Sequence, residues 1–116
     1  MRNDKDNLIV NLSVDFALAV IAYCELLEAD RKFVIANQLL KSGTSIGANV
    51  REAQNAESKA DFIHKIKIAA KEADETEYWL ILCERSPNYP DPSGLKEQLN
   101  SIKNIISKII ITSKKS

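Results

Sequence analysis

The amino-acid sequence predicts an all-α protein, folded as one antiparallel up-and-down four-helix bundle over residues 1–116. Apolar residues recur at steps of three and four in four separate stretches, which is the spacing of one face of an α-helix. No stretch alternates apolar and polar residues as a strand does. All three prolines fall within residues 87–92, so the one strong break in the helical pattern lies late in the chain.

The first two helices are expected over about residues 7–28 and 33–56, because the charged residues 28–32 interrupt the apolar pattern between them. In the first helix the predicted buried stripe is Leu8, Leu12, Phe16, Ala19, Tyr23 and Leu26. In the second helix it is Ala36, Leu39, Gly43, Ile46, Val50 and Ala53.

The third helix is expected over about residues 59–86, because Ser58 followed by Asp61 suits a capped helix start and Pro87 ends the pattern. Its predicted stripe is Phe62, Ile66, Ala69, Ala73, Thr76, Leu80 and Cys83. A fourth helix is expected over about residues 94–112, with the stripe Leu95, Leu99, Ile102, Ile106 and Ile109.

The apolar surface exceeds what one bundle needs to bury. Residues 16–24 are apolar on every side of the first helix, and Ile105, Ile110 and Ile111 extend the stripe of the fourth helix onto a second face. Large exposed apolar patches usually mark interfaces. We therefore expect a homo-oligomer; the alternative is a monomer with an unusually apolar surface.

The sequence predicts a cytoplasmic protein with no membrane-spanning segment. The longest apolar run, residues 16–24, has nine residues, whereas a helix needs about 20 to cross a bilayer. The mixed charges near the N-terminus do not form a secretory signal. In a reducing compartment Cys24 and Cys83 are expected to be buried free thiols, with a disulfide or a reactive thiol as the alternatives.

Two glycines lie in the middle of the second helix, although each glycine costs a helix about 1 kcal/mol relative to alanine. Gly43 and Gly47 lie one turn apart, so they predict close packing of a neighbouring helix. A phosphate-binding loop is the alternative, but the glycine spacing fits neither nucleotide-binding motif and no strand precedes it.

Three sequence blocks resemble a known family. Residues 38–53 read QLLKSGTSIGANVREA, residues 58–65 read SKADFIHK and residues 71–80 read KEADETEYWL. They closely resemble the bacterial four-helix-bundle proteins encoded in intervening sequences of 23S rRNA genes. The resemblance covers residues 7–86 and implies a ring-like homopentamer. It implies no enzymatic activity and no cofactor.

The resemblance extends to the accessory protein of diversity-generating retroelements, a basic pentamer that engages nucleic acid, and so implies RNA or DNA as a partner. This chain has no net charge, but residues 95–116 carry five basic side chains and one acidic side chain. The candidate contacts to phosphate are Lys96, Lys103, Lys108, Lys114 and Lys115. The alternative is an ordinary solvated helix face.

No catalytic or metal site is expected. His64 is the sole histidine, so no second Asp-x-x-His motif is available to complete a di-metal centre with Asp61. Glu72 and Glu75 are interpreted as solvated carboxylates beside a buried Trp79 rather than as a catalytic pair.

Polar residues in the matched blocks are expected to form hydrogen bonds between helices or subunits and so to fix their register. The candidates are Ser45, Asn49, Arg51 and Glu52. The sequence thus predicts a non-enzymatic, self-associating scaffold that binds nucleic acid through basic residues. The alternative function is an adaptor that docks a protein partner on its apolar helix faces.

Overall fold

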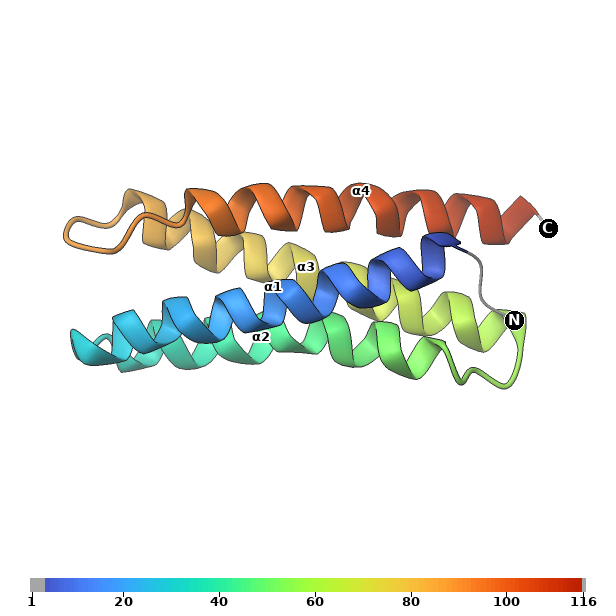
Figure 1. The fold of residues 1–116 in the computed structure, drawn as a ribbon, viewed down its shortest axis with the longest axis horizontal. Helices are drawn as coiled ribbons and strands as arrows, with labels where there is room; N and C mark the ends of the chain where they lie inside the picture. The colour runs from blue at the N-terminus through green and yellow to red at the C-terminus, as the bar shows by residue number, and fades with distance from the viewer. Residues whose placement is uncertain (1–3, 116) are drawn as a thin grey trace.

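The computed structural model describes residues 4–115, with side chains from residue 8 onward, and shows four α-helices (Figure 1). They are α1 (Asp4–Ala29), α2 (Phe33–Ala53), α3 (Lys59–Arg85) and α4 (Ser93–Lys115). No strand occurs within residues 4–115. The predicted all-α class with four helices is confirmed.

Consecutive helices run in opposite directions and pack side by side, and α1 also packs against α4, which closes the bundle (Figure 1). The resulting rod measures 47 × 20 × 19 Å. The turn between α1 and α2 and the loop between α3 and α4 share one end of the rod. The turn between α2 and α3 lies at the other end, together with the start of α1 and the end of α4.

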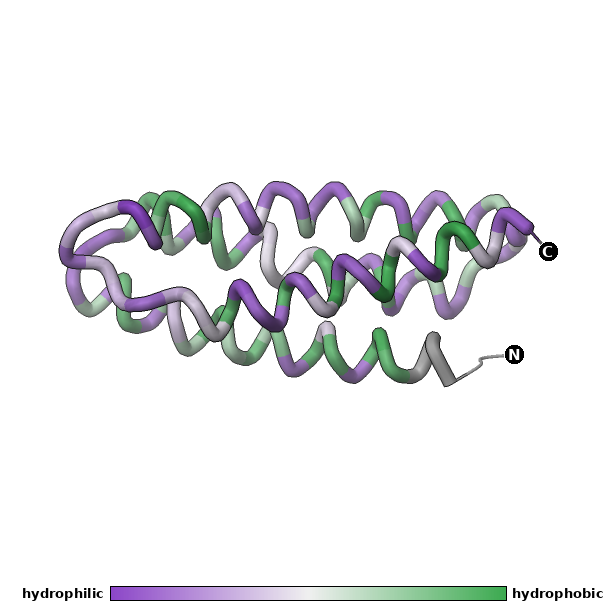
Figure 2. Tube along the Cα trace, turned by 90° about the horizontal axis from the view of Figure 1, so that it is seen from above, coloured by the Kyte–Doolittle hydropathy of each residue, from purple (hydrophilic) through white to green (hydrophobic). Residues whose placement is uncertain are grey.

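In α1 the buried face differs from the predicted stripe. Leu8 and Leu26 are exposed, whereas the buried face consists of Ile9, Ser13, Phe16, Val20, Tyr23, Cys24 and Leu27. Hydrophobic residues recur along the coloured part of α1 (Figure 2), so periodicity alone does not determine which face turns inward. Within the described residues, α1 is also the one helix long and apolar enough to span a membrane, over Leu8–Ala29. A core helix of a bundle meets the same criterion.

The predicted stripes of the other helices form the core, except that Phe62 is only partly buried. Two buried hydroxyls lie within this apolar core. The side chains of Ser42 in α2 and Thr76 in α3 share a hydrogen bond of 2.9 Å, and Thr76 Oγ1 also lies 2.7 Å from the carbonyl oxygen of Glu72. Because buried hydroxyls need partners, this pair fixes the register of α2 against α3.

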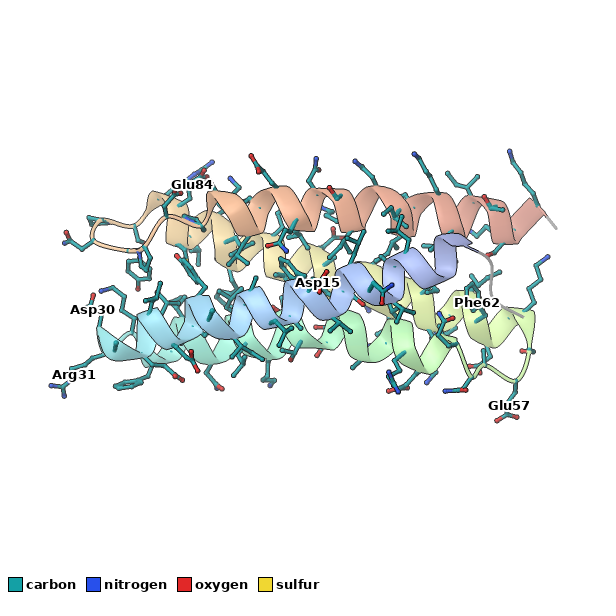
Figure 3. The ribbon with its side chains drawn as sticks, viewed as in Figure 1. Asp15, Asp30, Arg31, Glu57, Phe62 and Glu84 are labelled. Carbon is teal, nitrogen blue, oxygen red and sulfur yellow. The ribbon has the colours of Figure 1, made fainter. Side chains whose placement is uncertain are left out.

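The turn between α1 and α2 is short, and Asp30 and Arg31 extend from it into solvent (Figure 3). Arg31 has a φ of 63°, the left-handed conformation common where a helix ends. The Lys32 ammonium lies 4.8 Å from the centre of the Tyr89 ring in the α3–α4 loop. Tyr23 donates a 2.6 Å hydrogen bond to the carbonyl oxygen of Pro90. These contacts link α1 and the α1–α2 turn to the α3–α4 loop.

The second helix ends three residues earlier than expected, at Ala53 rather than residue 56. Beyond it the backbone forms tighter turns, in which Gln54 N–H donates to the carbonyl oxygen of Arg51. Ala56, the next apolar residue after Ala53, is only partly buried. The predicted start of α3 has the expected cap, because Ser58 Oγ accepts a 3.0 Å hydrogen bond from Asp61 N–H.

Candidate functional site

Gly43 and Gly47 lie where α2 crosses α1. A Cβ added to Gly43 would lie 3.0 Å from both methyl carbons of Val20, and one added to Gly47 would lie 3.4 Å from the carbonyl oxygen of Ser13. The α-helix is continuous through residues 42–49, so its backbone amides form no phosphate-binding loop. The glycines instead bring two helix backbones close together.

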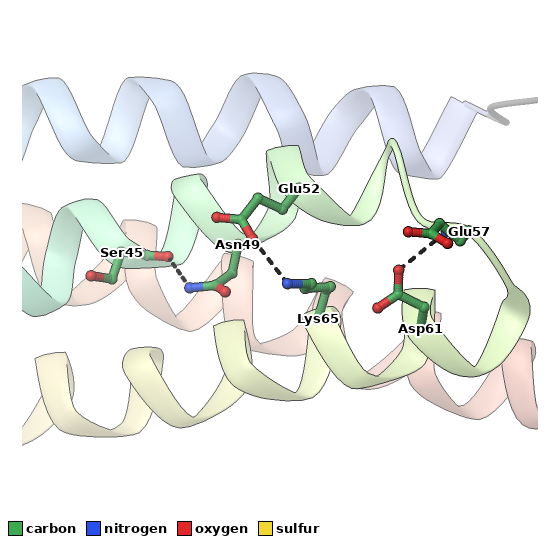
Figure 4. Close-up of polar contacts among 6 residues, drawn as sticks. All are labelled: Ser45, Asn49, Glu52, Glu57, Asp61 and Lys65. Atoms are coloured by element: carbon green, nitrogen blue, oxygen red, sulfur yellow. Dashed lines mark hydrogen bonds and ion pairs between the residues drawn. The ribbon is translucent and has the colours of Figure 1, made fainter.

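Two of the four predicted polar residues bond within their own helix. Ser45 Oγ donates to the carbonyl oxygen of Lys41 at 2.6 Å, and Asn49 Nδ2 donates to the carbonyl oxygen of Ser45 at 2.8 Å (Figure 4). Neither side chain forms a hydrogen bond to α1 or α3 among the described residues. Both are partly exposed on α2.

The other two differ from each other. Glu52 accepts a 3.0 Å hydrogen bond from Lys65 Nζ and so links α2 to α3 (Figure 4). This bond raises the pKa of Lys65 above its ordinary value. Arg51 is exposed and lies beside Val10 and Asn55, and it forms no ion pair with the described side chains of residues 8–115. Among the described side chains of residues 8–115, Glu52 is the one residue of these four that forms a hydrogen bond to another helix.

Two of the five candidate lysines on α4 are paired with acids of α3. Lys96 Nζ lies 2.6 Å from Glu84 Oε1. Lys103 Nζ lies 2.9 Å from Glu77 Oε1 and 3.1 Å from Asp74 Oδ1. Desolvation lowers the pKa of Lys103, but the bonds to the two carboxylates outweigh it and leave the pKa raised. These acids reduce the positive field that the lysines offer to phosphate.

The remaining candidates are Lys108, Lys114 and Lys115, which are exposed on the second half of α4. None of them forms an ion pair with the side chains described between residues 8 and 115. The basic character of α4 is therefore concentrated at its C-terminal end.

The main exposed apolar surface lies on α1 and the adjoining start of α2. We call the outer part of it on α1 the α1 apolar face, formed by Leu8, Val14, Leu18, Ile21 and Leu26. Leu18 is 60% exposed, and Val34 at the start of α2 is 76% exposed. The surplus apolar surface predicted for the first helix is thus present in the folded chain, outside the core.

The groups considered for catalysis or metal binding form no joint site among the described residues. His64 is exposed on α3, and Asp61 is engaged in the turn before it, accepting from the Glu57 N–H at 3.1 Å (Figure 4). No cluster of metal-binding side chains occurs among the described residues. Trp79 is only partly buried, and its Nε1 donates to Glu75 Oε2 at 3.3 Å.

Cys24 and Cys83 are buried free thiols. Cys24 Sγ donates to the carbonyl oxygen of Ala36 at 3.4 Å. Burial, with smaller contributions from Glu28 and Cys83, raises the pKa of Cys24 to about 11. Burial also raises the pKa values of Cys83 and Tyr23. Burial therefore favours the protonated form of these groups in the folded protein.

We expect the free energy of unfolding to fall as the pH rises from about 9 to 11. The unfolded Cys24 thiol ionises near pH 8.5, whereas the folded thiol keeps its proton up to about pH 11. The stabilisation is complete below the unfolded pKa and is lost through the folded pKa. Urea unfolding at pH 8, 9.5 and 11 measures it, and Cys24→Ala should flatten the decline. Native thiols that react at pH 8 as fast as free cysteine would contradict the interpretation.

The model of the family described as "23S rRNA-intervening sequence protein" matches residues 5–111. The chain is also similar to a crystal structure from Bacteroides thetaiotaomicron VPI-5482, described as a protein of unknown function from the S23 ribosomal protein family. The two share 42% sequence identity with a TM-score of 0.87, over 91% of this chain and 97% of that one. No curated protein matches.

Proposed function

Because the chain belongs to the 23S rRNA-intervening sequence protein family, we propose that it is a non-catalytic cytoplasmic scaffold that assembles with itself through the α1 apolar face. The observation that carries the proposal is the exposure of five large apolar side chains on one helix of a small bundle. Such a patch is rarely left in water on a monomer. Burying it between subunits stabilises the assembly by about 25 cal/mol per Å².

The assembly we propose is a closed ring of five subunits. A ring requires a heterologous contact, in which one surface of each subunit meets a different surface of the next. The α1 apolar face supplies one such surface. Phe33 and Val34 at the start of α2, both exposed, extend the apolar area beyond α1.

A second role, binding of RNA or DNA, is favoured by Lys108, Lys114 and Lys115. These three lysines lie within two helical turns and have no acid paired with them among the described side chains of residues 8–115. Five-fold repetition would multiply a weak positive patch into a ring. Phosphate contacts made in this way depend steeply on salt, whereas a protein partner docked on apolar surface would not be released by salt.

A native mass spectrum of the protein purified at low salt tests both roles in one experiment. We expect a mass of five subunits, or a multiple of five, with bound nucleic acid that is lost at higher salt. A bare assembly would reject the nucleic-acid role and favour the adaptor alternative. A monomer at all concentrations would reject the scaffold itself.

A further inference from the structure

The solvent side of α4 carries a stripe of seven residues separated by steps of three and four, which places them on one helix face. We call it the α4 outer stripe: Gly94, Glu97, Ser101, Asn104, Lys108, Ile111 and Lys115, all exposed. It has an acid near its start, bases near its end and small polar residues between them. None of the seven takes part in the ion pairs with α3.

We infer that the α4 outer stripe is a two-fold contact between two copies of this chain, with their α4 helices antiparallel. In a two-fold contact the same surface of each copy meets itself in the reverse direction. An axis midway between Ser101 and Asn104 places Glu97 of one copy opposite Lys108 of the second copy, and Ser101 opposite Asn104. Parallel helices would instead place like charges together, which is unfavourable.

The shape of the stripe agrees with its charges. The same axis places Gly94 opposite Ile111 of the second copy. A Cβ added to Gly94 would meet no atom within 4 Å, and Gly94 lines a groove of about 450 Å³ between α1 and α4. The groove is walled by Ala19, Ala22 and Leu26 among others. Ile111 is 55% exposed, so it can enter the groove of the second copy as a knob enters a hole.

A second copy fits this surface better than an unrelated partner, because residues 94–111 of the stripe match their own reverse in charge and size. Lys115 lies beyond the paired stretch. This inference does not rest on the proposed ring, because the α4 outer stripe lies on α4. Of the α1 apolar face, Leu26 alone also walls the groove beside Gly94. A ring of five has no two-fold axis within it, so the α4 contact joins subunits of different rings.

Charge exchange tests the antiparallel pairing. Self-association of each full-length variant, free of nucleic acid, is measured by sedimentation velocity at low salt. Each variant is made both in the wild-type protein and in the Leu18→Glu protein, in which contacts through the α1 apolar face are disrupted. Glu97→Lys or Lys108→Glu alone should weaken the α4 contact about 10- to 30-fold, because two ion pairs become repulsive. The double variant in one chain restores opposite charges and should recover the association.

Lys67→Glu, at an exposed position of α3, makes the same change of charge elsewhere and should leave association unchanged. Single variants that associate like the wild type would overturn the inference. Single variants that weaken association without recovery in the double variant would overturn the antiparallel register. If the Leu18→Glu protein is monomeric at every concentration tested, the α4 contact is rejected and the proposed ring is unaffected.

Discussion

Gly43→Leu is expected to lower the melting temperature of the protein by about 10–15 °C, which corresponds to a loss of about 3 kcal/mol. The first side-chain carbon alone would lie 3.0 Å from both methyl carbons of Val20. The remaining carbons of leucine have no space between α1 and α2 unless the two helices separate. Separation would also open the packing around Ile46, which is fully buried. Thermal unfolding followed by circular dichroism measures the change.

Two controls distinguish a steric cause from a change in helix propensity. Gly94→Ala adds a methyl group where nothing lies within 4 Å, so it should stabilise the protein slightly through propensity. Val20→Ala removes the two methyl groups that a residue at position 43 would meet. The double variant Gly43→Leu/Val20→Ala should therefore be more stable than the sum of the single effects predicts. Strict additivity of the two changes would argue against the contact.

The sequence predicted the core of α2, α3 and α4 better than that of α1. In the later helices polar residues lie on one side and apolar residues on the other, so the 3–4 spacing identifies the buried face directly. In α1 the apolar residues surround the helix, and the buried face includes Ser13, which a hydropathy pattern assigns to solvent. Ser13 is buried because Gly47 leaves room for its backbone and side chain beside α2. Which face of α1 is buried therefore depends on how α1 packs against α2, and the sequence of α1 alone does not determine it.

The surroundings of the candidate surface residues likewise depend on packing between helices, which one segment of sequence does not reveal. The five lysines of α4 were visible as a basic cluster, but the acids that pair with Lys96 and Lys103 belong to α3, more than ten residues away in the chain. Only the register of α3 against α4 brings them together. The surplus of apolar residues could be predicted, whereas the side chains that remain outside could be assigned only once the inner face of α1 was known.

Leu18→Glu is expected to abolish assembly through the α1 apolar face while the subunit still folds. Leu18 is 60% exposed in the subunit, so a carboxylate there remains in water and should change the free energy of unfolding by less than about 0.5 kcal/mol. In a subunit contact the same carboxylate would lose its water without gaining a partner. Together with the lost apolar burial, this should raise the subunit dissociation constant at least about 100-fold. Sedimentation velocity measures the change.

Ala60→Glu is the matched control, because it adds the same charge at an exposed position in the first turn of α3, a helix that does not pack against α1. It should assemble like the wild type. If Leu18→Glu and Ala60→Glu retain the same mass, the assembly uses another surface. If both dissociate, added negative charge rather than the lost apolar contact is responsible. Dissociation of Leu18→Glu alone, with an unchanged melting temperature of the subunit, assigns the exposed leucine to the contact between subunits and explains the large apolar side chains on the outer side of α1.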